Sequence, residues 1–129
     1  MSAQIAASHG YEVEVDCRFI PEQSSIEERQ YVYAYTIIIR NISGPRAQLL
    51  NRHWMITDGW GRVEEVKGPG VVGKHPHLGE GESFTYTSFC PLPTSTGTMR
   101  GSYRMRADDG SEFDIEIPQF FLYEPSSMN

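Results

Sequence analysis

The sequence predicts an all-β protein, a sandwich of about seven to eight antiparallel strands in the immunoglobulin or fibronectin type III style. Three observations predict it: apolar and polar residues alternate in several separate segments, turn residues recur at roughly ten- to fifteen-residue spacing, and no segment has the apolar period of about 3.6 residues typical of a helix. A closed barrel is the alternative. The 129 residues suit one domain, with an ordered core over about 10–124 and flexible tails.

The first two strands are predicted over 11–19 and 29–42. In the first, five apolar residues alternate with four charged ones, which is typical of a half-buried strand. In the second, tyrosines and isoleucines form one face, while Val32, Ala34 and Ile38 make the other face apolar too. This pattern predicts a central strand that is covered on both faces.

The next two strands, over 47–57 and 62–66, are predicted to form a hairpin around Asp58-Gly59. The alternation is lost within 47–57, which indicates a bulge. Glycines and prolines then crowd residues 68–81, so we expect a long loop without any regular element.

The remaining strands are predicted over 82–89, 99–108 and 113–117. The pair Pro91 and Pro93 is expected to end the first of them. The other two form a hairpin in which an arginine row faces an acidic row on the solvent side.

Charge and composition exclude several classes of function. The 17 acidic and 11 basic side chains give a net charge of −6, which repels nucleic acids and anionic membranes. We find neither a signal peptide nor an apolar run of about 20 residues, so we expect a cytoplasmic protein. Cys17 and Cys90 are expected to be reduced, with a disulfide between them as the minor alternative.

From residue 68 onward the chain carries a series of motifs. They are Gly68-Pro69-Gly70-Val71-Val72-Gly73, Pro76, Gly81-Glu82-x-Phe84-x-Tyr86-x-Ser88, Gly97-x-Met99-x-Gly101-Ser102-Tyr103 and Ile117-Pro118-x-Phe120. Two earlier motifs are Tyr33-x-Tyr35-x-Ile37-x-Ile39-x-Asn41 and His53-Trp54. Together these motifs resemble the ApaG family over nearly the whole chain.

The resemblance implies a fibronectin type III-like sandwich, in agreement with the strand pattern. For bacterial members it implies a link to cobalt resistance and magnesium efflux without an accepted molecular activity. Eukaryotic relatives occur as a domain of an F-box protein and of a DNA polymerase delta-interacting protein. These settings imply a protein-interaction module.

The segment Gly68–Gly73 matches the G-x-G-x-x-G pattern of dinucleotide-binding folds. That motif needs a following helix, and Pro76 with the later glycines excludes one. Two interpretations stay open beside a purely structural one, which we favour: the loop docks a protein, or its amides bind phosphate, pyrophosphate or a nucleotide between Lys67 and Lys74.

His75 and His77 are two residues apart, so in an extended segment both rings would face one side and offer two ligands to a divalent metal. Because two ligands do not complete a site, we expect no metal and no cofactor. We also expect no enzyme activity, since neither Ser88 nor Cys90 lies in a nucleophile motif.

Our leading hypothesis is therefore a non-enzymatic binding module for a protein partner. Its predicted contact residues are Gly68, Gly70, Gly73, Lys67, Lys74 and Trp60. Trp60 is included because it lies in a hairpin turn, where an aromatic side chain can be an exposed anchor. An exposed edge strand would also allow a homodimer.

Overall fold

The computed structural model describes residues 3–128 and confirms the predicted all-β sandwich. This part of the chain has nine strands and two short 3₁₀ helices. In chain order the elements are β1 (Gln4–Ser8), β2 (Tyr11–Phe19), η1 (Pro21–Gln23), β3 (Tyr31–Asn41), β4 (Ala47–Asp58), β5 (Val63–Pro69), β6 (His77–Leu78), β7 (Ser83–Leu92), β8 (Thr96–Ala107), β9 (Glu112–Tyr123) and η2 (Pro125–Met128).

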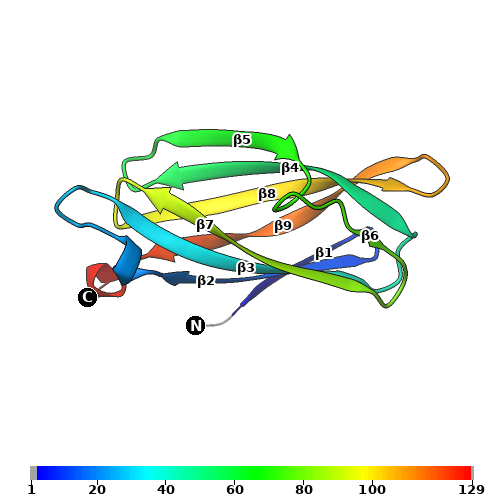
Figure 1. The fold of residues 1–129 in the computed structure, drawn as a ribbon, viewed down its shortest axis with the longest axis horizontal. Coiled ribbons are helices and arrows are strands. Elements are labelled where there is room, and N and C mark those ends of the chain that lie inside the picture. Colours follow the sequence, from blue (N-terminus) through cyan, green and yellow to red (C-terminus); the bar gives the residue numbers. More distant parts are fainter. Residues whose placement is uncertain (1–2, 129) are drawn as a thin grey trace.

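Two antiparallel sheets pack against each other (Figure 1). The first has the strand order β1-β2-β3-β7, and the second has the order β5-β4-β8-β9 with β6 added beside β4. Strands β1 and β2 contact β9, which closes one side of the sandwich. The outer strands β7 and β5 therefore end the two sheets on the opposite side.

The core lies between the sheets, where the inward side chains of both layers meet. In β2 the residues from Tyr11 to Cys17 alternate between buried and more exposed positions, as the sequence predicts. Aromatic rings join the layers, because Tyr35 packs edge-on against Trp54 with a centroid distance of 5.4 Å, and Trp54 packs against Phe120 at 6.0 Å. The alternation in the sequence thus corresponds to inward and outward faces.

The prediction that the second strand is covered on both faces is wrong in part. β3 is an inner strand of its sheet, between β2 and β7. No second layer lies over its outward face in the part of the chain that the structure describes, so Thr36 and Ile38 are only half-buried. Val32 and Ala34 on the same face are buried, and η1 contacts β3, so the prediction holds only for the first part of this strand.

Two strands lie where we expected none. β1 pairs with β2, with Gln4 opposite Val15, so regular structure begins well before residue 10. β6 pairs with β4 inside the segment 68–81, which we expected to lack any regular element, and β5 enters the same segment as far as Pro69. The breakers in this segment shorten its strands but do not exclude them.

The prolines after residue 90 do not end their strand as we expected. β7 continues to Leu92, and Pro91 lies opposite Val32 of β3. Because β7 is an edge strand, the nitrogen of Pro91 can face away from β3, and its missing N–H then removes no hydrogen bond from the sheet.

Asn41 is a fully buried polar residue at the end of β3. Its Nδ2 donates to Pro45 O at 3.2 Å and to Leu78 O at 3.1 Å, and its Oδ1 accepts from Gly44 N at 2.8 Å. Nδ2 also lies 3.1 Å from the hydroxyl of Tyr11. These bonds satisfy the amide inside the core and connect the end of β3 to the loop before β4 and to β6.

The predicted hairpin of arginine and acidic rows is confirmed in β8 and β9. Arg104 forms ion pairs with Glu112 at 3.3 Å and Asp114 at 3.4 Å, and Arg106 pairs with Glu112 at 2.8 Å. These side chains are partly exposed, so each pair contributes at most about 1 kcal/mol. The predicted bulge in β4 is also present, between Leu49 and Asn51.

The cysteines are free and buried in this fold. Burial raises the pKa of Cys17 and of Cys90 to about 12 in each case. Both thiols are therefore protonated near neutral pH, which makes them poor nucleophiles.

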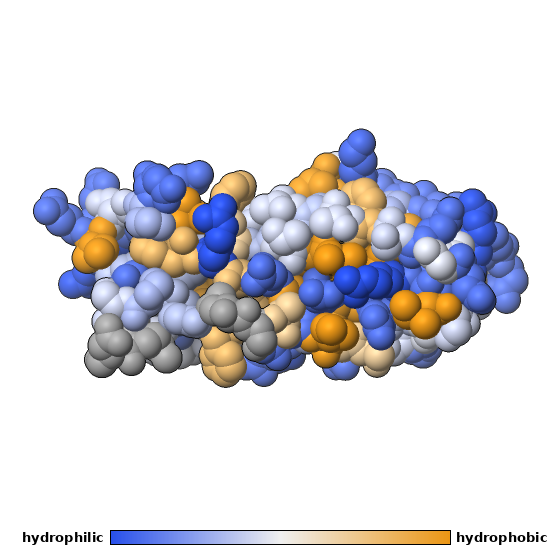
Figure 2. Space-filling view, turned by 90° about the horizontal axis from the view of Figure 1, so that it is seen from below, coloured by the Kyte–Doolittle hydropathy of each residue, from blue (hydrophilic) through white to orange (hydrophobic). Residues whose placement is uncertain are grey.

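The surface seen from below carries apolar side chains in several separate patches among polar ones (Figure 2). Because these patches are separate, this face has no large apolar area that would by itself mark a docking surface.

Within residues 3–128, no helix has the length and apolar character needed to span a lipid bilayer.

Candidate functional site

The strongest candidate site is the surface between the outer strands β5 and β7, which we call the open side. β5 joins the two segments that the sequence singled out, because the turn 58–62 precedes it and the glycine segment 68–74 follows it. The turn 58–62 also lies beside the end of β7, at the left of Figure 1, where Gly59 N donates to Thr94 Oγ1 at 2.7 Å. The two predicted contact segments thus border one surface.

Trp60 is an exposed aromatic residue on a rigid turn. Asp58 organises this turn, since its Oδ1 accepts from Trp60 N at 2.9 Å and from Arg62 N at 3.0 Å. The indole is 52% exposed, and the guanidinium carbon of Arg62 lies 4.4 Å from its ring centroid, in cation–π range. Arg29 approaches the same ring at 6.0 Å. The ring is therefore held in place while remaining accessible to a partner.

The glycine segment is fixed by Arg52, an inward-facing residue of β4. Its Nη1 donates to Pro69 O at 2.9 Å and to Gly70 O at 3.1 Å. A Cβ at position 68 would lie only 2.9 Å from Nη2, so the absence of a side chain at Gly68 leaves room for the guanidinium. Sequence reasoning missed Arg52, because this contact depends on the pairing of β4 with β5.

The other two glycines serve the turn. Gly70 has φ +61°, and a Cβ there would lie 2.5 Å from Lys74 O. Val72 and Gly73, with φ +44° and +77°, form a tight hairpin turn between Val71 and Lys74, whose backbones exchange hydrogen bonds of 2.9 and 2.8 Å. This local geometry is a structural reason for each glycine.

Three amides of this segment are occupied by backbone carbonyls. Gly70 N donates to Leu50 O at 2.9 Å, and the amides of Val71 and Lys74 donate to each other's carbonyl. Lys67 lies 3.8 Å from Glu65, on the outward face of β5. The amides of Gly70, Val71 and Lys74 are thus not free to converge on an anion, as the amides of a nest do.

The tip of the glycine segment presents a valine to solvent. Val71 is buried in the core, whereas Val72 is 53% exposed. A β-branched residue with positive φ is strained, so the backbone of Val72 costs about 1 kcal/mol or more. A strained and exposed apolar side chain is the type of feature that function retains.

Between β5 and β7 lies a groove of about 290 Å³. Aromatic and aliphatic side chains line it, among them Tyr35, Trp54 and Phe89, of which Phe89 is 52% exposed. Arg52 and Glu64 add one charge of each sign. Phe89 and Glu64 were not predicted as site residues, since only the tertiary structure brings β7 beside β5.

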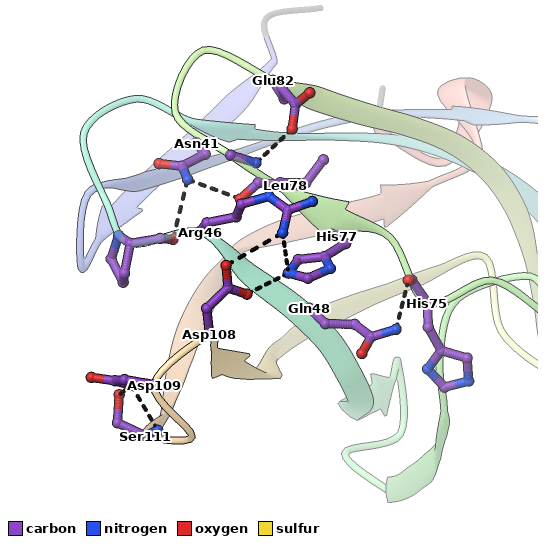
Figure 3. A network of polar contacts seen from close by, with 12 residues as sticks. Asn41, Arg46, Gln48, His75, His77, Leu78, Glu82, Asp108, Asp109 and Ser111 are labelled. Carbon is purple, nitrogen blue, oxygen red and sulfur yellow. Dashed lines mark hydrogen bonds and ion pairs between the residues drawn. The ribbon is translucent and has the colours of Figure 1, made fainter.

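The two histidines that the sequence offers as weak metal-ligand candidates bind different protein partners. His75 Nδ1 lies 3.1 Å from Leu49 O. His77 Nε2 lies 2.7 Å from Asp108 Oδ1 and 3.3 Å from Arg46 Nη1 (Figure 3). The hydrogen bond from His77 and the charge of Arg46 hold the pKa of Asp108 below its usual value. Both rings are thus committed to protein contacts, and residues 3–128 contain no group of three His, Cys, Asp or Glu side chains placed to hold a metal.

The open side lies within the segment that matches a known family. The ApaG domain model matches residues 21–107, which include β5, β7 and both bordering segments. The ApaG protein of Dechloromonas aromatica (strain RCB) is 53% identical over 121 residues, covering 92% of this chain and 95% of the relative. The chain belongs to the ApaG family. The ApaG protein of Methylobacterium sp. (strain 4-46) is 52% identical, with 93% and 92% covered.

Solved structures agree with this assignment. The crystal structure of a Bordetella pertussis protein named ApaA has a TM-score of 0.85 at 50% identity and covers 89% of this chain and 94% of its own. The ApaG resemblance predicted from the motifs is therefore confirmed over most of the chain. The glycine-rich motif of this ApaG-family chain is part of the open side.

Proposed function

We propose that this ApaG-family chain is a non-enzymatic binding module that docks a protein partner on the open side. The observation that carries the proposal is that Trp60, exposed on a rigid turn, and Val72, exposed at a strained tip, lie at the two ends of one strand beside an aromatic groove. Aromatic anchors with little conformational freedom are enriched among the residues that dominate protein interfaces.

The glycine segment supports this role better than phosphate binding. Its amides at Gly70, Val71 and Lys74 already donate to carbonyls, and Arg52 uses its guanidinium to hold the segment. A phosphate that used these three amides would have to break their bonds to the carbonyls. A protein surface can instead contact Val72 without any rearrangement of the loop.

Affinity capture with matched variants tests the proposal. The immobilised chain would be compared with Trp60→Ala and with Val72→Asp, and Arg100→Ala on β8 would serve as the control, because Arg100 is exposed and lies away from the open side. We expect the first two variants, shown to be folded by circular dichroism, to lose a set of proteins that the control retains. If all variants captured the same proteins, the open side would not be the docking surface.

A further inference from the structure

β7 is an edge strand without the usual protection against strand pairing. It has ten residues, SFTYTSFCPL, and none is Lys, Arg, Asp or Glu. Exposed edges in soluble proteins are normally shortened, charged or covered, because their free N–H and C=O groups attract other strands. An uncharged edge of this length therefore invites pairing with another chain.

The other edges of the two sheets carry such protection. β5 contains Glu64, Glu65 and Lys67, and it ends at Pro69. On the closed side, β1 lies against β9, where Ser8 Oγ accepts a hydrogen bond from Glu116 N at 3.0 Å. β1 also lacks charged residues but packs against β9, whereas β7 has neither charged residues nor a comparable contact with the other sheet.

The backbone of β7 presents hydrogen-bonding groups to the open side. Val32, opposite Pro91, bonds through its N–H to Ser24 Oγ and through its C=O to Ile20 N, so the backbone groups of Pro91 face away from β3. Alternate residues of a strand point their backbone groups in the same direction, so Thr85, Thr87 and Phe89 also direct theirs away from β3. Their side chains are exposed. A strand added here would form a regular ladder.

The groove beside this edge indicates the chemistry of the added strand. Because β7 is uncharged and exposes Phe89, a matching strand would be uncharged where it pairs and would alternate apolar and β-branched side chains. Glu64 lines the groove, and no cation within the described residues lies at ion-pair distance from it, whereas Glu65 contacts both His53 and Lys67. A Lys or Arg in the partner would complement this carboxylate, and the net charge of −6 favours the approach of a basic segment.

We infer that the edge of β7 binds an extended segment of a partner protein by strand addition, with apolar residues beside Phe89 and a basic residue facing Glu64. Main-chain hydrogen bonds to the edge would provide affinity, and the groove with Glu64 would provide specificity. This inference rests on the proposed function and names the part of the open side that the partner occupies.

A phage-displayed library of random peptides about twelve residues long tests the inference, since such peptides can span the ten residues of β7. Two variants are matched. Thr87→Lys adds a charge to the edge strand β7, and Thr36→Lys adds the same charge to the neighbouring inner strand β3. The hydroxyls of Thr36 and Thr87 lie 2.9 Å apart, so both charges are placed at the same point along the sheet. We expect enriched peptides to alternate apolar residues and to contain Lys or Arg. They should bind wild type and Thr36→Lys similarly and Thr87→Lys at least about tenfold more weakly.

Further measurements locate the peptide. Bound peptide should slow the hydrogen exchange of the amides of Thr85, Thr87 and Phe89, and Glu64→Gln should weaken peptides that contain a basic residue by about threefold. Three results would overturn the inference: no enriched peptides, equal binding to Thr87→Lys, or a concentration-dependent dimer of the free chain that this variant abolishes, since a second copy would then occupy the edge. If Trp60→Ala loses its partners while Thr87→Lys keeps them, the proposed function stands and strand addition fails.

Discussion

The guanidinium of Arg52 lies against Gly68, in space that would be crowded by any side chain at that position. Through this contact Arg52 reaches the carbonyls of Pro69 and Gly70 and connects the inner surface of β4 to the glycine segment. The pair therefore determines where the tip with Val72 stands relative to the groove. Its disruption should change both stability and the order of the open side.

A double-mutant cycle tests this contact. Arg52→Ala should destabilise the fold by about 2 kcal/mol, because two hydrogen bonds from a charged donor are lost. Gly68→Ala should also destabilise the wild type, since the new Cβ displaces the guanidinium, but it should have little effect in the Arg52→Ala background. Urea unfolding measures all four proteins, with Arg100→Ala as the control. Additive effects of the two changes would contradict the contact.

The strain at Val72 can be relieved by substitution. Val72→Asn creates an Asn-Gly turn, which suits the positive φ angles of both positions, and should stabilise the fold by about 1 kcal/mol. The same change removes an exposed apolar side chain and should weaken capture of the partner. Thermal unfolding and affinity capture on the same sample measure both effects. A variant that is less stable than wild type, or that binds equally well, would argue against a strained contact residue.

Pyrophosphate should leave the glycine segment unchanged. Because the amides of Gly70, Val71 and Lys74 already donate to carbonyls, we expect no shift of their NMR resonances at millimolar pyrophosphate or at millimolar ATP with magnesium. The amide of Ala107, which bonds to Ser111 O in another turn, is an internal reference. Saturable shifts confined to residues 68–74 would instead favour the nucleotide-binding alternative.

The contact between His77 and Asp108 should be visible in a carboxyl titration. The hydrogen bond from His77 is the main cause of the lowered pKa of Asp108, so its NMR midpoint should lie below 3.8 and should rise in His77→Gln. Because the folded pKa is lowered, the stabilisation is present above the unfolded value and is lost as the pH falls through the folded pKa. Asp109, whose pKa is lowered by Ser111, should not respond to His77→Gln. An unchanged Asp108 midpoint in this variant would contradict the contact.

The sequence predicts the long strands well and the contacts between segments poorly. Strict alternation locates β2 because half-buried strands need it, and a long run of aromatic and β-branched residues locates β3. β1, QIAAS, has a single large apolar residue, and β6 has two residues between breakers, so both depend on pairing with a neighbouring strand. Trp60 and the glycine segment could be identified from turn chemistry. Arg52, Glu64 and Phe89 could not, since strand register and sheet order bring them together.

Photo-crosslinking from the position of Trp60 tests the central claim most directly. Benzoylphenylalanine would replace Trp60 on the open side or Arg100 on the outward face of β8, and the cells would be irradiated before crosslinked products are identified. We expect one crosslinked protein from position 60, and its yield should fall when excess wild-type chain is added. We expect no crosslinked protein from position 100. Equal crosslinking from both positions, or none from position 60, would contradict a docking surface between β5 and β7.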